Sequence, residues 1–235
     1  MQRKLRLLIV EDETAIRTGL IDVFVYHGYD VDFAVDGPTG QAMAQNGRYD
    51  LILLDVMLPG RNGYEICEAI RERDREQPII MLTAKSGDAD IIHGLAQGAD
   101  DYVTKPFSVA HLVLRVQAVL RRTRVSTNNA AAIHLTDSIE VDTQNMCAQI
   151  GTNQVRFTRR EIEILQYLSE HSERPVSREE LLHKVWGYAR DLEIETRTVD
   201  IHIAKLRRKL EPDAKQPKHL ITVRGGGYRL VRSGQ

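Results

Sequence analysis

Residues 51–59 read Leu51-Ile-Leu-Leu-Asp-Val-Met-Leu-Pro59, and in this stretch four apolar residues lead directly to the carboxylate of Asp55. A strand that is apolar at every position is typical of a parallel sheet covered on both faces. Other apolar runs, separated by segments of helical length, lie at 5–10, 31–35, 79–82 and 102–103. This alternation predicts an α/β fold with a five-stranded, doubly wound parallel sheet.

The chain is longer than one typical domain, with 235 residues of which 42% are hydrophobic. A helix with Ser108 as its N-cap and basic residues at its end is expected to close the α/β unit. The residues at 124–132 are small or polar and lack an amphipathic period, as in a linker. We therefore expect one domain at 1–123, a linker at 124–132 and a second domain at 133–235.

The second half has the pattern of short strands, three helices and a hairpin. Two of the helices begin at capping boxes, Thr158 with Glu161 and Ser177 with Glu180. The expected elements lie at 139–141, 146–150, 158 onward, 177–187, 196–210, and 220–231 with Gly225-Gly226-Gly227 at the tip. This pattern predicts an α+β winged helix-turn-helix domain.

Composition argues against several classes of protein. The chain has no apolar run of about eighteen residues, and its first residues lead into a short strand and not into a signal-peptide core. We therefore expect a cytoplasmic protein without a membrane partner. Cys67 and Cys147 lack the spacing of a zinc site, which favours free thiols.

Charged or hydroxyl side chains stand at the ends of the expected strands. Glu11 and Asp12 follow the first strand, Asp55 the third, Thr83 the fourth and Lys105 the fifth. In doubly wound folds ligands bind at this edge of the sheet. Paired carboxylates suit Mg²⁺, and a carboxylate that attacks phosphorus forms an acyl phosphate. We expect Asp12 and Asp55 to bind Mg²⁺, Asp55 to be the nucleophile, and Lys105 to pair with Asp55 or its phosphate.

These residues are part of a longer pattern, across residues 5–122, that resembles the receiver domains of two-component response regulators. It is carried by Glu11-Asp12, Asp55-Val-Met-Leu-Pro59 with Gly63, Thr83-Ala84, and Gly98-Ala-Asp-Asp-Tyr-Val-Thr-Lys-Pro-Phe107. The resemblance implies a flavodoxin-like fold and a sensor histidine kinase as the phosphoryl donor. It also implies that Lys105–Pro106 is a cis peptide bond.

The same resemblance implies a role for each residue of the site. Asp55 is the implied phosphoacceptor, Asp12 and the Met57 carbonyl bind Mg²⁺, and Glu11 supports the metal-bound waters. Thr83 and Lys105 bind the phosphoryl oxygens, and Tyr102 is the switch aromatic.

The expected helix at 196–210 has two different faces. Its apolar stripe, which is expected to pack on the core, consists of Val199, Ile203, Leu206 and Leu210. At 100° per residue the opposite face, which suits a major groove, carries Arg197, Ile201, Ala204, Lys205 and Arg208. Five Lys or Arg residues accompany one acidic residue in this helix, so basic charge is concentrated there.

Residues 133–232 resemble the OmpR/PhoB class of winged-helix effectors. The resemblance is carried by Thr158-Arg-Arg-Glu161, Ser177-Arg-Glu-Glu-Leu181, Val185-Trp-Gly187, Arg197-Thr-Val-Asp-Ile-His-Ile203, Leu206-Arg-Arg-Lys-Leu210 and Thr222-Val-Arg-Gly-Gly-Gly-Tyr228. It implies a recognition helix for double-stranded promoter DNA, with Thr198, Asp200, Ile201 and Lys205 near bases and Arg197, His202 and Arg207 near phosphates. Arg208 and Thr222 complete the expected set, and Arg224 reaches the minor groove. The loop at 188–195 resembles a segment that contacts RNA polymerase.

Phosphorylation is expected to turn one face of the receiver into a homodimer interface. The expected residues are Ile91, Ile92, Leu95, Asp100, Asp101, His111, Leu114, Arg115 and Arg122. In the family this face is held by charge pairs, and Asp100, Asp101, Arg115 and Arg122 remain to make some of them. Ile91 and His111 replace a common base and a common acid, and Gln117 replaces another base. The resemblance with these departures implies a more apolar dimer face.

Two other functions fit parts of the pattern. An aspartyl-phosphate hydrolase would also use Asp55 as its nucleophile, but Met57 stands where such enzymes usually have a second acid. A phosphorylation-independent DNA-binding transcription factor with a vestigial receiver would explain the altered dimer face but not the intact acidic pocket. We therefore expect a regulator of transcription that is gated by phosphorylation and is not an enzyme.

Overall fold

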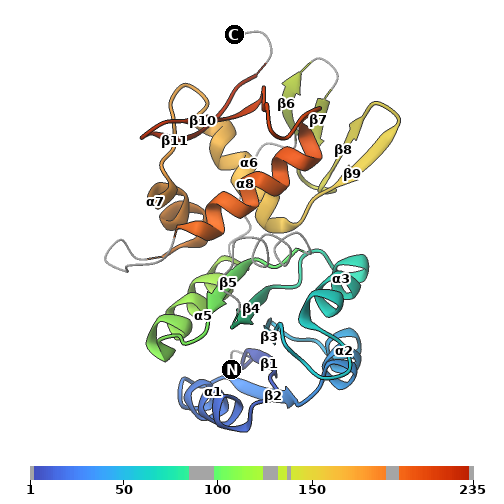
Figure 1. The fold of residues 1–235 in the computed structure, drawn as a ribbon, viewed down its shortest axis with the longest axis vertical. Helices are drawn as coiled ribbons and strands as arrows, with labels where there is room; N and C mark the ends of the chain where they lie inside the picture. The colour runs from blue at the N-terminus through green and yellow to red at the C-terminus, as the bar shows by residue number, and fades with distance from the viewer. Residues whose placement is uncertain (1–2, 85–97, 124–131, 137–138, 189–195, 233–235) are drawn as a thin grey trace. The chain divides into compact units, whose positions relative to one another are not determined.

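The computed structural model describes residues 3–84, 98–123, 132–136, 139–188 and 196–232 (Figure 1). The chain divides into two compact units, residues 1–124 and 125–235, which we describe separately. None of the helices in these described ranges is long and apolar enough to cross a membrane. The expected residues Ile91, Ile92 and Leu95, and nearly all of the expected linker, lie outside the described ranges.

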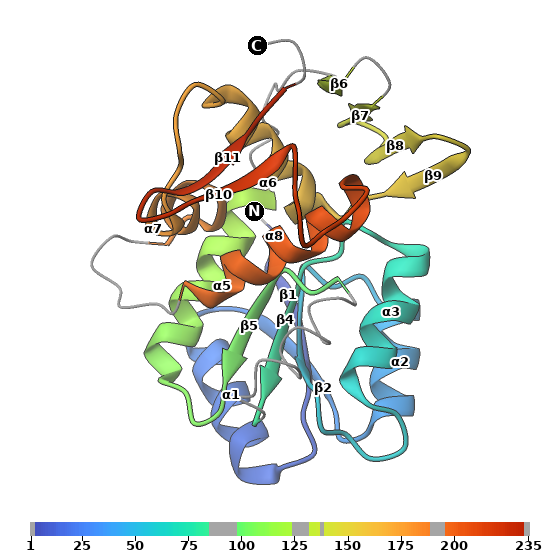
Figure 2. The same ribbon diagram turned by 45° about the horizontal axis from the view of Figure 1, so that its top comes forward.

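The first unit is built on a five-stranded parallel sheet in the order β2-β1-β3-β4-β5. Its strands are β1 (Arg6–Val10), β2 (Asp30–Ala34), β3 (Leu51–Asp55), β4 (Ile79–Thr83) and β5 (Asp101–Thr104). The helices in its described part are α1 (Thr14–Tyr26), α2 (Gly37–Asn46), α3 (Gly63–Arg73) and α5 (Val109–Thr123). Helices α1 and α5 cover one face of the sheet, and α2 and α3 cover the other (Figure 2). The predicted doubly wound fold is confirmed.

Burial on both faces explains why the two central strands are apolar at every position before the last. Every residue of β3 and of β4 is buried. One core lies between the sheet and helices α1 and α5, where Leu53 and Leu82 meet Phe24 and Val116. Removing this apolar surface from water is the main favourable term for the unit.

The start of α3 approaches the end of β3 closely. Asn62 caps α3 and forms a capping box with Glu65. A Cβ atom added to Gly63 would lie 2.2 Å from the carbonyl oxygen of Asp55. Real Cβ atoms do not approach a backbone oxygen so closely, so this position requires glycine.

The described residues of the second unit form a four-stranded antiparallel sheet, three helical segments and a hairpin. Its sheet consists of β6 (Ala132–Thr136), β7 (Ile139–Asp142), β8 (Cys147–Ile150) and β9 (Asn153–Arg156). The helices are α6 (Arg159–Glu170), α7 (Arg178–Leu181), which continues as the π-helix η1 (Leu182–Trp186), and α8 (Arg197–Leu210). The hairpin pairs β10 (Leu220–Val223) with β11 (Gly227–Leu230). The winged-helix prediction is confirmed.

Three features of this unit differ from the sequence-based expectation. Strand β6 begins at Ala132, at the end of the expected linker, and β9 was not expected at all, since Asn-Gln-Val-Arg is a polar edge strand. The helix that begins after Ser177 changes to π geometry at Leu182, which no local residue pattern indicates. It ends, as expected, at Gly187, which has a left-handed φ of 76°.

Candidate functional site

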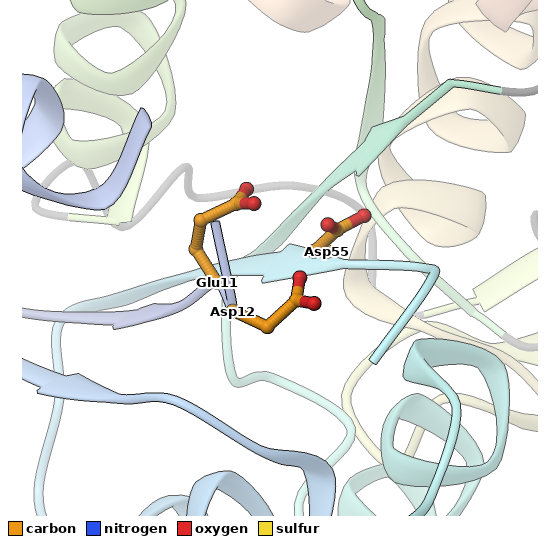
Figure 3. Close-up of side chains that lie close together, drawn as sticks. All are labelled: Glu11, Asp12 and Asp55. Atoms are coloured by element: carbon orange, nitrogen blue, oxygen red, sulfur yellow. The ribbon is translucent and has the colours of Figure 1, made fainter. Parts of the chain in front are cut away.

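Three carboxylates meet at the carboxyl edge of the parallel sheet (Figure 3). Glu11 and Asp12 follow β1, and Asp55 is the last residue of β3, the neighbouring strand. One oxygen of each carboxylate lies within 4.8 Å of the others. Glu11 and Asp55 are buried, whereas Asp12 is exposed. The three expected acidic residues are thus close enough to share one cation.

Lys105 joins this cluster from the segment after β5. Its Nζ atom lies 2.8 Å from Oδ2 of Asp55 and 2.8 and 2.9 Å from the two carboxylate oxygens of Glu11. The Lys105–Pro106 peptide bond is cis, as expected. Three carboxyl groups therefore face one ammonium group, an arrangement that suits a divalent cation.

Burial and neighbouring charges shift the acid–base properties of the cluster. Burial raises the pKa of the Glu11 carboxyl to about 7, with the charge of Asp55 adding to the rise and Lys105 opposing it. Burial alone would lower the pKa of the Lys105 ammonium, but its hydrogen bonds to Asp55 and Glu11 raise that pKa above its ordinary value. Lys105 is therefore a permanent positive charge beside Asp55.

The other residues expected at the pocket lie on β4, on β5 and in the loop that follows β3. Thr83 ends β4, which pairs with β3, and is fully buried. Met57 lies two residues after Asp55, its side chain is exposed, and its backbone N–H donates to Oδ1 of Asp55 at 3.1 Å. Tyr102 is a buried residue of β5.

Arg17 of α1 is a site residue that the sequence reasoning missed. Its guanidinium donates to the carbonyl oxygens of Glu11 at 3.0 Å and Asp12 at 2.9 Å, and it lies 5.7 Å from the centre of the Phe33 ring. These bonds fix the backbone that carries two of the three carboxylates. The sequence signal for this role is the position of a basic residue, Arg17, five residues after Asp12 in the next helix.

Three of the charged residues expected at the dimer face, Asp100, Asp101 and Arg115, form ion pairs within the receiver. Asp100 accepts from Arg71 at 2.9 Å, and Asp101 accepts from Arg115 at 2.7 Å, and all four residues are buried. The sequence predicted that these residues pair with a second receiver, and it did not predict the ion pairs that they form within their own chain. His111 and Leu114 of α5 are exposed, and the side chain of Arg122 lies outside the described part of the chain.

The residues expected at DNA occupy different environments in the second unit. Arg208, Thr222 and Arg224 are exposed, whereas Arg197, Asp200 and Arg207 are half-buried. Four further residues that the resemblance implied at DNA, Thr198, Ile201, His202 and Lys205, are buried, and two of them, Ile201 and Lys205, belong to the predicted outer face of the helix. All of the loop expected to contact RNA polymerase except Tyr188 lies outside the described residues.

Long-range partners explain the burial of two of these residues. Lys205 lies 3.2 Å from Oε1 of Glu161, a fully buried carboxylate of α6 that also pairs with Lys209 at 2.6 Å. The His202 ring makes an edge contact with Trp186, with ring centres 5.2 Å apart, and its Nδ1 lies 2.9 Å from the Thr198 carbonyl oxygen. Burial lowers the pKa of His202 to about 4, so its ring is neutral near pH 7.

Two family models match the chain, one in each unit. Residues 7–117 match the response regulator receiver domain, and residues 152–230 match the C-terminal domain of transcriptional regulatory proteins. The boundaries of both matches fall within the two compact units.

Relatives of known sequence match along the whole chain. The probable transcriptional regulator ycf27 of Guillardia theta is 40% identical, over 99% of this chain and 92% of its own. The sensory transduction protein RegX3 of Mycobacterium tuberculosis H37Rv is 36% identical, over 95% of this chain and 98% of its own.

Two solved structures are also similar to this chain along almost its whole length. A mutant of RitR is 27% identical, with a TM-score of 0.71 over 97% of this chain and all of that one. The response regulator DrrB, a Thermotoga maritima OmpR/PhoB homolog, is 28% identical, with a TM-score of 0.51 over the same shares. This chain belongs to the OmpR/PhoB class of two-component response regulators and acts on transcription.

Proposed function

We propose that a sensor histidine kinase phosphorylates Asp55 in the presence of Mg²⁺, and that this modification controls promoter binding. The observation that supports the proposal is the position of Asp55, buried at a strand end between the carboxylates of Glu11 and Asp12 and the ammonium of Lys105. A nucleophilic carboxylate, a cation site and a fixed positive charge are the groups that phosphoryl transfer to a carboxylate requires.

Each side chain has a specific task in this reaction. An Asp55 oxygen attacks phosphorus, the P–N bond to the phosphohistidine of the kinase breaks, and the released ring nitrogen takes up a proton. Asp12, Asp55 and the Met57 carbonyl would hold Mg²⁺, which reduces the repulsion between the carboxylate and the incoming phosphoryl group. Lys105 and Thr83 would bind the phosphoryl oxygens, and Glu11 would orient metal-bound water.

The new charge on Asp55 would change the surface of the receiver that pairs with a second copy. Asp100, Asp101 and Arg115 have partners within the chain, so the proposed homodimer depends more on apolar contacts. Leu114, which is 40% exposed on α5, supports such a face, and Ile91, Ile92 and Leu95 are proposed to contribute to it. We place the protein in the cytoplasm, where it would act with RNA polymerase at promoters.

The test compares the wild-type chain with Asp55→Ala, each with and without beryllofluoride and Mg²⁺. Molecular mass and binding to a duplex DNA library are measured together. The proposal requires that only the wild type dimerises and binds more tightly. A wild-type protein that is already dimeric and does not respond would support the phosphorylation-independent alternative.

A further inference from the structure

Asp200 of α8 is the centre of a small hydrogen-bond network in the second unit. Its Oδ1 atom accepts from Nε of Arg178 at 2.5 Å and from the hydroxyl of Tyr228 at 2.6 Å. A terminal nitrogen of Arg178 also donates to the Tyr228 hydroxyl at 3.0 Å, which closes the triangle. The guanidinium of Arg178 lies 4.9 Å from the centre of the Tyr228 ring.

The three residues of this network come from three different elements. Arg178 begins α7, Asp200 lies in the first turn of α8, and Tyr228 belongs to β11 of the hairpin. The Tyr228 backbone also pairs with Val176, two residues before α7, through hydrogen bonds of 2.8 and 2.9 Å. One carboxylate oxygen thus connects the expected recognition helix, α8, to both the preceding helix, α7, and the hairpin of β10 and β11, which is the wing of the fold.

Arg207 makes a second connection between α8 and the hairpin. Its Nε donates to the Leu220 carbonyl at 2.8 Å, and a terminal nitrogen donates to Oγ1 of Thr222 at 2.7 Å. Arg207 follows Asp200 by seven residues, so the two lie on the same side of the helix, about 10 Å apart along its axis. Hydrogen bonds therefore hold this side of α8 against the hairpin at two positions along the helix axis, Asp200 and Arg207.

The contacts of Asp200 argue against a direct role in reading bases. A carboxylate that reads a base accepts a hydrogen bond from the cytosine amino group. Oδ1 of Asp200 already accepts two short hydrogen bonds, one of them from a charged donor, and these fix the carboxylate toward α7 and β11, so that a base could use only Oδ2 in the orientation which the network sets. Burial raises the pKa of the Tyr228 hydroxyl to about 12, and its bond to Asp200 adds to the rise, so the hydroxyl remains a donor near pH 7.

We propose that Asp200 is a positioning residue that sets the separation between the recognition helix and the wing, and that it does not read a base. The proposal rests on DNA binding by this unit. It predicts that loss of Asp200 weakens binding to all sequences alike, because helix and wing no longer reach the duplex together.

The first test selects bound sequences from a randomised duplex DNA library, with the full chain in beryllofluoride and Mg²⁺. We expect Asp200→Ala to bind about tenfold more weakly, Asp200→Asn to lose less because the amide keeps an acceptor oxygen, and both to prefer the wild-type sequence. A base-reading aspartate would give a different result. Asn pairs with adenine, so a change of preference towards adenine at one position in Asp200→Asn would overturn the proposal.

The second test needs no DNA and so separates this inference from the function of the unit. Hydrogen exchange of the amides of 224–230 is measured in the wild type, Asp200→Ala, Tyr228→Phe and the double variant. Faster exchange in each single variant, with little more in the double, is expected if the residues share one network. Unchanged exchange in both single variants would overturn the proposal. Tyr228→Phe removes one oxygen only, and provides the result even if Asp200→Ala does not fold.

Discussion

The ammonium of Lys205 lies 3.2 Å from a carboxylate oxygen of Glu161, and these two residues are 44 positions apart on different helices. Burial alone would raise the pKa of Glu161, but Lys205 and Lys209 outweigh it and lower that pKa to about 2. Removing one member of a buried ion pair leaves the other charges without compensation. Replacing one member of the pair therefore tests how strongly it stabilises the packing of α8 on α6.

Glu161→Ala should destabilise the second unit by about 3 kcal/mol, because two largely buried ammonium groups lose their counter-ion. Trp186 is the only tryptophan of the chain and is fully buried in this unit, so its fluorescence in urea follows the unfolding of this unit. Glu170→Ala, at an exposed position of α6, is the matched control. Equal urea midpoints for the two variants would show that the ion pair does not stabilise the unit.

The second unit should lose stability as the pH falls from about 6.5 to about 4. The His202 pKa is about 4 in the folded protein and 6.5 for an ordinary histidine, so in this window the unfolded chain binds the extra proton. The stability that neutral His202 provides is present above pH 6.5 and is lost through the folded pKa. His202→Gln should flatten the dependence of the Trp186 urea midpoint between pH 7 and 4.5. His134→Gln, at a well-exposed position, should keep the wild-type slope, and identical slopes in all three proteins would contradict the prediction.

Gly63→Ala should destabilise the receiver by about 2 kcal/mol or more and slow the phosphorylation of Asp55, because the added Cβ would collide with the Asp55 carbonyl oxygen. Circular dichroism in urea and labelling by a small acyl-phosphate donor measure the two effects. Gly19→Ala is the control, since a Cβ there meets no atom within 4 Å and alanine favours a helix. A Gly63→Ala protein as stable and reactive as the control would show that α3 can move away from β3.

Of the three hairpin glycines, only Gly227 should be strictly required. Its φ is 102°, and an added Cβ would lie 2.1 Å from the Val176 carbonyl oxygen. Gly225 has a φ of 72° but open space around it, and asparagine tolerates that conformation. We expect Gly227→Ala to lose DNA affinity by about tenfold or more, while Gly225→Asn stays within about twofold of the wild type. The reverse order in a duplex DNA titration would contradict this packing argument.

Arg17→Met should weaken Mg²⁺ binding by the receiver, because the carbonyl oxygens of Glu11 and Asp12 lose the donor that fixes them. Calorimetric titration of the full chain with Mg²⁺ alone measures the effect. Arg48→Met removes the same charge at an exposed position and serves as the control. If both variants bind Mg²⁺ equally, the effect of Arg17 is one of overall charge and not of geometry.

The sequence predicted those features that depend on local pattern. The apolar residues of β3 can be recognised because a strand covered on both faces is apolar along its length. A charged residue such as Asp55 is therefore expected only where the strand ends. The pairing of Lys205 with Glu161 could not be predicted in this way. A helical wheel assigns a direction to the Cα–Cβ bond, but a lysine stem is long enough to reach around the helix to a distant carboxylate.

The same limit applies to the receiver surface. Asp100 and Asp101 were expected at the dimer face, but their partners Arg71 and Arg115 lie 29 and 14 residues away. Pairings over such distances depend on the folded topology, and a single sequence contains no local signal for them.

The contacts of Lys105 also depend on the folding of the whole central sheet. Its two carboxylate partners are 94 and 50 residues away in the chain, and they come together only when β1, β3, β4 and β5 have all paired. A newly made or damaged receiver that lacks one of these strands has no assembled pocket to accept a phosphoryl group. Under the proposed function, only a receiver that has completed its central sheet could therefore carry the signal.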